Sequence, residues 1–269
     1  MSVFDSGFTQ GIGLFETMRA YNGRVFRLDR HLERLRNSAR ALGWTAVPEA
    51  ADLRENVGRV VGATELADAR VRLTVTTGSL RADAGEPQLT IVATAAPNVK
   101  YPPEYYQKGA TVLVSDYRQN PDDPTTGHKT TSYFARLTAL RLAHARGAAE
   151  AMHFTHDGRL AEGAISNVFL VRQRELLTPP LDTPVLPGIT RACVTELAAE
   201  LRIAVHERPL TIHELLAADE VFLTNAMMEL LPVVRVEREP IGTERPGEVT
   251  RELYEAYGRL VEKECAEHG

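Results

Sequence analysis

The residues whose types and spacing suggest chemistry begin with Lys129, in the run Gly127-His128-Lys129-Thr130-Thr131-Ser132-Tyr133. A strand-like segment further along the chain carries Glu162, and Gly188-Ile189-Thr190 opens a predicted helix. These groups supply an amine able to form a Schiff base, a carboxylate able to hold a pyridinium nitrogen, and a helix start able to hold a phosphate. A protein that uses pyridoxal phosphate needs all three.

Each signal taken alone also has a purely structural interpretation. Lys129 is one of four lysines, Lys100, Lys108, Lys129 and Lys263, and by itself it can be a solvated lysine. Glu162 can be a surface-facing strand glutamate; if it faces a core, it must be paired or hydrogen-bonded. Arg34 can be a solvated arginine on a helix. The helix start at Gly188 is weak evidence by itself, since every helix has such an end, and Thr224-Asn225-Ala226 offers another turn with free backbone amides.

Composition excludes several classes of function. A chain of 269 residues is long enough for one large or two modest domains, and a formal net charge of -5 does not favour binding to nucleic acid or an anionic membrane. No apolar run approaches the roughly 20 residues that span a bilayer, and the first residues do not look like a secretory signal. Cys193 and Cys265 form no CxxC pair. We expect a cytoplasmic protein with no nucleic acid or membrane partner.

The first part of the chain is predicted to contain two helices and several strands. Apolar residues at three- and four-residue steps predict a helix over 28–42, with Asp29 as its N-cap and Gly43 after its end. A second helix is expected over 48–61. Alternating apolar and polar residues predict a strand at 71–76, and further strands are expected at 89–95 and 111–115. This pattern indicates an α+β unit.

A proline-rich polar stretch at 118–127 predicts a loop. We therefore predict a small N-terminal domain over 1–117, an interdomain loop over 118–126 and a larger C-terminal domain over 127–269. Asp157-Gly158 predicts a hairpin turn, and Thr211 with Glu214 a capping box. Further helices are expected at 132–146, 188–201 and 248–264, and further strands at 149–155, 167–172, 175–178, 220–224 and 231–236.

The chain resembles the class IV, or fold-type IV, pyridoxal-phosphate enzymes, which include branched-chain and D-amino-acid aminotransferases, (R)-selective amine transaminases and 4-amino-4-deoxychorismate lyases. The resemblance runs from Gly11 to about Val234. It rests on the blocks Gly11–Arg19, His31–Leu35, Gly127–Tyr133, Glu162–Phe169, Leu186–Arg191 and Thr224–Val233, which stand in the family's order. It implies an α+β, two-domain fold, with a small α/β sandwich domain and a larger pseudo-barrel domain, and a homodimer.

The resemblance also implies roles for individual residues. Lys129 would form the internal aldimine and move the proton, and Glu162 would hold the pyridine nitrogen. The remaining cofactor-binding residues would contact the phosphate; they are Arg34, Ile189, Thr190, Asn225 and Ala226.

For the substrate, the resemblance indicates Arg81 as the arginine that binds the carboxylate in the D-amino-acid branch, together with Glu16. Two positions depart from the family's pattern. Asp83 replaces the histidine found near that arginine, and Ser132 replaces an asparagine found in many relatives. Both departures concern the substrate rather than the cofactor.

We therefore predict a pyridoxal-phosphate-dependent aminotransferase that exchanges an amino group between a small-molecule amino donor, with D-amino acids favoured and (R)-primary amines possible, and a 2-oxo acid. The same groups could also act in a 4-amino-4-deoxychorismate lyase, which forms 4-aminobenzoate and pyruvate. A branched-chain L-amino-acid aminotransferase is a further alternative. A non-enzymatic scaffold on the same fold is disfavoured, because both Lys129 and Glu162 are present.

Overall fold

The computed structural model divides by its internal contacts into two compact units. The first unit comprises residues 1–99, 128–133 and 261–269, and the second comprises residues 100–127 and 134–260. The structure describes residues 2–79 and 88–266. The two folding domains predicted from the sequence, 1–117 and 127–269 with an interdomain loop at 118–126, remain a prediction.

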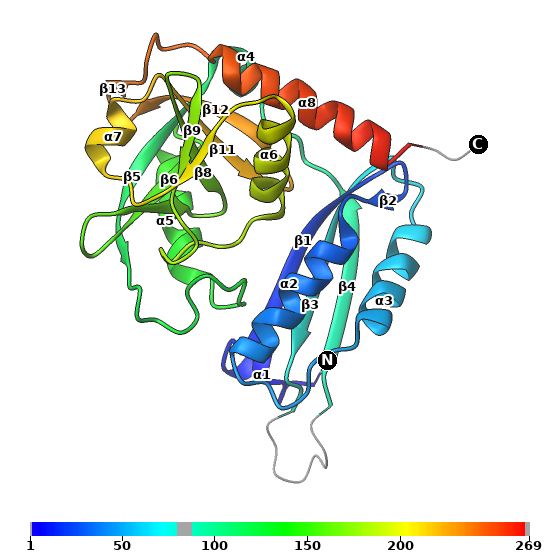
Figure 1. The fold of residues 1–269 in the computed structure, drawn as a ribbon. Helices are drawn as coiled ribbons and strands as arrows, with labels where there is room; N and C mark the ends of the chain where they lie inside the picture. The colour runs from blue at the N-terminus through cyan, green and yellow to red at the C-terminus, as the bar shows by residue number, and fades with distance from the viewer. Residues whose placement is uncertain (1, 80–87, 267–269) are drawn as a thin grey trace. The chain divides into compact units, whose positions relative to one another are not determined.

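The first unit is built on a four-stranded antiparallel sheet in the order β2-β1-β3-β4. Its two longer helices, α2 and α3, cover one face of this sheet (Figure 1). The elements are α1 (Ser6–Thr9), β1 (Gly13–Tyr21), β2 (Arg24–Val25), α2 (Leu28–Ala41), α3 (Ala50–Gly62), β3 (Asp68–Thr76) and β4 (Thr90–Pro97).

Period-two patterning places the core of this unit between the sheet and the helices. Leu14 and Met18 of β1 face Leu32 and Leu35 of α2, and Leu73 of β3 joins them in one buried apolar cluster. Burying such side chains stabilises the fold by roughly 1.5–3 kcal/mol each. The helices and strands predicted in this unit are confirmed, within a few residues at their ends.

Two details of the first unit differ from the prediction. Helix α2 begins at Leu28 after Arg27, so Asp29 lies in its first turn and is not its N-cap. A carboxylate in the first turn still stabilises the helix, because it lies at the positive end of the helix dipole. Strand β1 was not predicted, because Gly13 to Glu16 are all buried and the alternation is hidden.

The segment 128–133 extends this sheet along the free edge of β1. The Phe15 amide donates to the Lys129 carbonyl at 2.9 Å, and the Thr131 amide donates to the Gly13 carbonyl at 2.8 Å. The Thr131 hydroxyl also donates to the Gly11 carbonyl at 2.6 Å. The main chain is therefore held by backbone pairing at Lys129 itself and two residues further on, at Thr131.

The second unit is built on a nine-stranded mixed sheet in the order β10-β9-β8-β11-β12-β5-β6-β7, with β13 paired to β12. The pairs β12–β5, β5–β6 and β9–β10 are parallel and the others antiparallel. The strands are β5 (Ala110–Gln119), β6 (Glu150–Thr155), β7 (Leu160–Gly163), β8 (Asn167–Arg172), β9 (Glu175–Thr178), β10 (Val205–Glu207), β11 (Glu220–Asn225), β12 (Glu229–Val236) and β13 (Glu239–Pro240). Because β7 at the end of the order contacts β8, the sheet curves into a half-barrel.

Five helices accompany this sheet in the described chain. They are α4 (Pro103–Lys108), α5 (Phe134–Ala145), α6 (Ile189–Glu200), α7 (Ile212–Leu216) and α8 (Glu248–Glu264), whose last residues belong to the first unit. Helix α5 packs on β5 and β6, and α6 packs on β10 and β11. The predicted hairpin turn at Asp157-Gly158 and the capping box at Thr211 are confirmed. Within the described residues no helix is long and apolar enough to cross a membrane.

Candidate active site

Lys129 of the first unit lies beside two aromatic rings. Its Nζ atom is 4.6 Å from the centre of the Phe15 ring and 5.4 Å from that of Tyr133. The two rings contact each other edge to face, with their centres 5.0 Å apart. The Arg72 guanidinium also lies on the Phe15 ring, at 3.8 Å. The rings thus contact the Lys129 amine, and the Phe15 ring contacts a second cation as well.

Arg34 is held by a carboxylate that the sheet buries completely. Glu16 of β1 is 0% exposed, and its oxygens accept from Arg34 Nε at 2.8 Å and Arg34 Nη2 at 2.5 Å. His31 Nδ1 lies 2.7 Å from Glu16 Oε2. Burial alone would raise the pKa of Glu16, but the Arg34 charge and the His31 hydrogen bond outweigh it and lower this pKa to about 2.

His31 is also affected by its burial. Burial lowers the pKa of His31 below its usual value, although Glu16 acts in the opposite direction. We infer that His31 is neutral near pH 7 and donates its Nδ1 proton to Glu16. Glu16 was predicted to bind substrate; the structure shows it bonded to Arg34 and His31, and its contact with a substrate remains a prediction.

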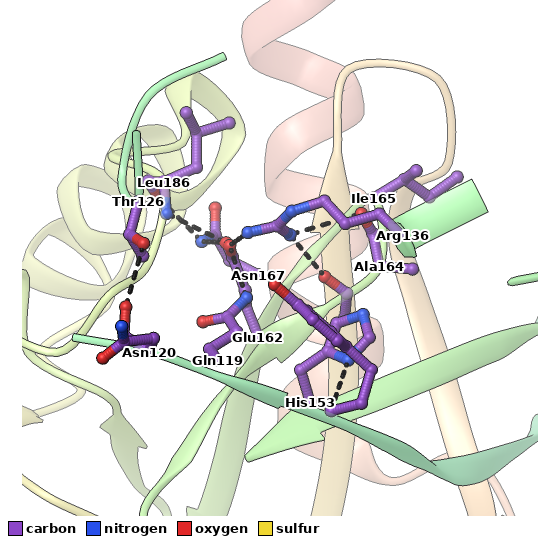
Figure 2. A network of polar contacts seen from close by, with 12 residues as sticks. Gln119, Asn120, Thr126, Arg136, His153, Glu162, Ala164, Ile165, Asn167 and Leu186 are labelled. Atoms are coloured by element: carbon purple, nitrogen blue, oxygen red, sulfur yellow. Dashed lines mark hydrogen bonds and ion pairs between the residues drawn. The ribbon is translucent and has the colours of Figure 1, made fainter. Parts of the chain in front are cut away.

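Glu162 of β7 is the buried acceptor of the second unit. It is 2% exposed, and Arg136 Nη2 of α5 donates to its Oε1 at 2.6 Å. Its Oε2 accepts from the Leu186 amide at 2.9 Å, with Asn167 Nδ2 at 3.4 Å. Figure 2 shows Arg136 and Leu186 approaching this carboxylate from different sides. All its contacts are donors, so Glu162 acts here as an acceptor.

Two further residues complete the polar network around Glu162. The side-chain amide of Gln119 can be placed in two orientations. In one of them its oxygen accepts from Arg136 Nη2 at 2.8 Å and its nitrogen donates to the Pro184 carbonyl at 2.5 Å. We prefer this orientation to the alternative, in which its nitrogen lies 3.4 Å from Glu162. Burial and the charge of Arg136 lower the pKa of His153 to about 4, so this histidine is neutral near pH 7.

The start of helix α6 is joined to Glu162 by the preceding loop. Asn167 Nδ2 donates to the Leu186 carbonyl at 2.8 Å, two residues before Gly188. A Cβ atom at Gly188 would collide with Asn167 Oδ1, which explains why glycine stands there. The amides of Ile189 and Thr190 lie in the first helical turn, which has no intrahelical acceptor for them. This turn is therefore suited to bind an anion.

The turn after β11 carries the other predicted phosphate contacts. Asn225 Oδ1 accepts from the Met227 and Met228 amides, both at 2.8 Å, and Asn225 Nδ2 donates to the Ile165 carbonyl at 3.1 Å. The Asn225 side chain thus fixes the turn. In the described part of the chain no hydrogen bond from the Ala226 amide is found, which leaves this amide for a ligand.

Some functional candidates lie outside the described residues or were not predicted. Arg81 and Asp83 fall in the undescribed segment 80–87, so Arg81 remains a prediction. Arg72 and Arg136 were not predicted. Arg72 alternates with buried residues along β3, so its outward direction was visible in the sequence, but its neighbour Phe15 was not. Among the described residues no group of histidine, cysteine and acidic side chains could hold a metal ion.

Comparison with known proteins identifies relatives over almost the whole chain. A Methanocaldococcus jannaschii protein, provisionally named a branched-chain-amino-acid aminotransferase, is 34% identical over 96% of this chain and 90% of its own. The aminodeoxychorismate lyase of Bacillus subtilis is 32% identical over 100% and 92%. The D-alanine aminotransferase of Bacillus licheniformis is 31% identical over 99% and 93%.

Solved structures of similar proteins show the same fold. The branched-chain amino acid aminotransferase of Escherichia coli is 30% identical, with a TM-score of 0.89 over 97% of this chain and 89% of its own. A second branched-chain amino acid aminotransferase, from T.th. and solved with pyridoxamine 5'-phosphate, is 28% identical, with a TM-score of 0.89 over 97% and 88%. The predicted α+β, two-domain fold-type IV architecture is thus confirmed.

The family model for amino-transferase class IV matches residues 13–236, which is most of the chain. This range contains Lys129, Glu162 and the start of α6, the groups singled out above. The relatives named above are transaminases and a lyase. The chain is therefore a member of the amino-transferase class IV family of enzymes.

Proposed function

We propose that this protein is a pyridoxal-phosphate-dependent aminotransferase that moves an amino group from an amino acid to a 2-oxo acid. The network that joins buried Glu162 to the loop before α6 carries the proposal. It combines an acceptor suited to a ring N–H with backbone donors suited to a phosphate, in one hydrogen-bonded group. The T.th. aminotransferase was crystallised with pyridoxamine 5'-phosphate, which supports the same cofactor.

The residues fit this cofactor by the chemistry of their donors and acceptors. Glu162 would accept the proton of the ring nitrogen. The amides of Ile189, Thr190 and Ala226 would donate to the phosphate, and Arg34, held by Glu16, would add a charge-assisted contact to it. When bound, pyridoxal phosphate supplies an aldehyde for the substrate amine and a ring that accepts an electron pair.

Lys129 would be the catalytic residue that holds and moves protons. Its amine would hold the cofactor through the aldehyde group and would accept the proton of the substrate Cα. The rings of Phe15 and Tyr133 would direct this amine. Backbone pairing fixes the main chain of Lys129, from which its side chain extends.

The charge next to Lys129 favours a substrate that carries a carboxylate. Arg72 contacts the same Phe15 ring as Lys129, and we infer from this shared contact that a substrate reacting at the amine meets the guanidinium. Arg81 remains the predicted basis for a D-amino-acid preference. Branched-chain aminotransferases occur among both the relatives and the solved structures, so an L-branched-chain amino acid is the donor to test beside D-alanine.

Two further expectations belong to this proposal. The homodimer rests on the resemblance, and the cytoplasmic location rests on the sequence. A lyase is the second candidate, because the Bacillus subtilis aminodeoxychorismate lyase aligns with the whole chain.

The test is to load the protein with pyridoxal phosphate and add D-alanine, L-leucine or (R)-phenylethylamine separately. An aminotransferase should lose the absorbance band of the aldehyde form of the cofactor when an amino acid is added. The band should return when a 2-oxo acid is added. The amine without a carboxylate should react more slowly. Rapid pyruvate release from aminodeoxychorismate without any 2-oxo acid, together with slow transamination, would instead establish the lyase.

A further inference from the structure

Arg136 contacts Glu162 but is not among the residues proposed to bind the cofactor or the substrate. Arg136 is the third residue of α5, and its side chain is 18% exposed. Its Nη2 donates to Glu162 Oε1 at 2.6 Å, and its Nη1 lies 3.4 Å from the Ala164 carbonyl, just after β7. One guanidinium thus contacts both the Glu162 side chain and the backbone that follows it.

The two oxygens of Glu162 are not equivalent. Oε2 already has two donors, the Leu186 amide and Asn167 Nδ2. With Gln119 turned toward Arg136 and Pro184, Oε1 has Arg136 as its donor within the described part of the chain. A carboxylate oxygen can accept about two hydrogen bonds. Oε1 is therefore the oxygen that retains capacity for a ring N–H.

Arg136 also controls how this oxygen is presented. The terminal torsion of a glutamate is broad, so the Leu186 and Asn167 contacts to Oε2 leave the carboxylate plane free to rotate. A charge-assisted hydrogen bond on Oε1 removes this freedom. Figure 2 shows the guanidinium reaching Glu162 from the side away from Leu186, so the carboxylate is held at both oxygens.

We propose that Arg136 is a positioning residue that turns Glu162 Oε1 toward the ring nitrogen of the cofactor. The proposal rests on the proposed function, because it assumes that Glu162 binds this nitrogen. It predicts that Arg136 strengthens cofactor binding only through the ring nitrogen. Arg136 is expected to contribute nothing to cofactor binding through the phosphate or through Lys129.

The experiment compares two cofactors on the full chain after cofactor removal. Pyridoxal phosphate has the ring nitrogen, whereas 1-deazapyridoxal phosphate has a C–H in its place and the same phosphate and aldehyde. We expect Arg136→Met to weaken binding of pyridoxal phosphate by about ten- to a hundredfold and to leave the affinity for the deaza compound near that of the wild type. Glu162→Gln should show the same selectivity, and the double variant should add little to either single variant.

The control is Arg141→Met, which removes an exposed arginine from the same helix and should change neither affinity. Equal losses for both cofactors in Arg136→Met would show a general structural role and overturn the proposal, as would no loss for either. Borohydride reduction separates the two hypotheses. If the wild type is not labelled on Lys129, the proposed function fails; if it is labelled but the selectivity is absent, only the role of Arg136 fails.

Discussion

Replacing Glu16 by glutamine tests the buried charge cluster that holds Arg34. Glutamine keeps the shape of glutamate but loses its charge and turns one acceptor oxygen into an amide NH2 group. Every contact made by the Glu16 oxygens is to a donor, at Arg34 and His31. The new NH2 group would therefore face another donor, and Arg34, whose side chain is only 9% exposed, would lose this carboxylate contact.

The expected free-energy change follows from the depressed pKa of Glu16 and lies near the usual cost of breaking a buried ion pair. The pKa of Glu16 is about 2 in the folded protein against an ordinary 4.5, which corresponds to about 3 kcal/mol of stability at pH 7. Breaking a buried ion pair by removing one partner costs about 3–5 kcal/mol. Because the folded pKa is depressed, this stability is present above pH 4.5 and is lost as the pH falls toward 2.

The assay is chemical unfolding followed by tryptophan fluorescence. Trp44 is the single tryptophan of the chain, and it packs against the apolar core of the first unit, where Glu16 lies. The free energy of unfolding of the wild type should exceed that of Glu16→Gln by about 3 kcal/mol at pH 7 and by under half of that difference at pH 3. Glu33→Gln, an exposed substitution on α2, serves as the control and should have little effect at either pH.

Two outcomes would refute this reasoning. A difference below about 1 kcal/mol at pH 7 would mean that the pair contributes no more than a surface ion pair. A difference of equal size at both pH values would mean that the loss comes from packing and not from the carboxylate charge.

Three further predictions concern other residues. Lys129→Ala should abolish turnover and remove the site of borohydride labelling, whereas Lys108→Ala should keep both; a phosphopyridoxyl label on Lys108 in the wild type would contradict the assignment. Arg72→Met should lower kcat/KM for amino acids by about ten- to a hundredfold, and Arg70→Met, on the same strand, much less; similar losses in both would exclude Arg72 as the carboxylate contact. Because the folded pKa of His153 is about 4, the unfolded chain takes up this proton first, and stability should fall by up to roughly 3 kcal/mol between pH 6.5 and 4. His153→Met should flatten the pH dependence of unfolding in that window, and an unchanged slope would show that other groups cause it.

Local patterns predicted many elements of the fold because periodicity is set by burial on one face. The strands 167–172 and 175–178 and the helix 248–264 have the predicted bounds. Strand β8, buried on both faces, was still visible as a continuous apolar run, whereas the buried start of β1 mixes Gly13 and Glu16 with apolar residues and shows neither such a run nor alternation. The order of strands in the second unit could not be derived, because β12 pairs with β5, more than a hundred residues earlier in the chain. Such long-range pairing depends on packing and not on local sequence.

The same limit applies to the site. Lys129 and Glu162 were found because each stands in a recognisable block, but the neighbours that orient them come from other elements. Arg136 precedes Glu162 by 26 residues, and their contact exists because α5 packs on the sheet that ends in β7. Helical periodicity around Arg136 indicates only a half-exposed arginine. A functional carboxylate can thus be predicted from sequence before the residue that positions it.

Arg34 and Glu16 show why such neighbours are hard to predict. A glutamate at an inward position of a strand is unfavourable unless a partner is buried with it. That inward position could have been taken as a signal that a cation lies opposite, on a helix packed against the strand. Arg34, on α2 beside the apolar residues Leu32 and Leu35, is that cation. The general inference is that a charged residue in the inward series of a strand indicates a nearby charge of opposite sign, and here the paired arginine is also the proposed phosphate contact.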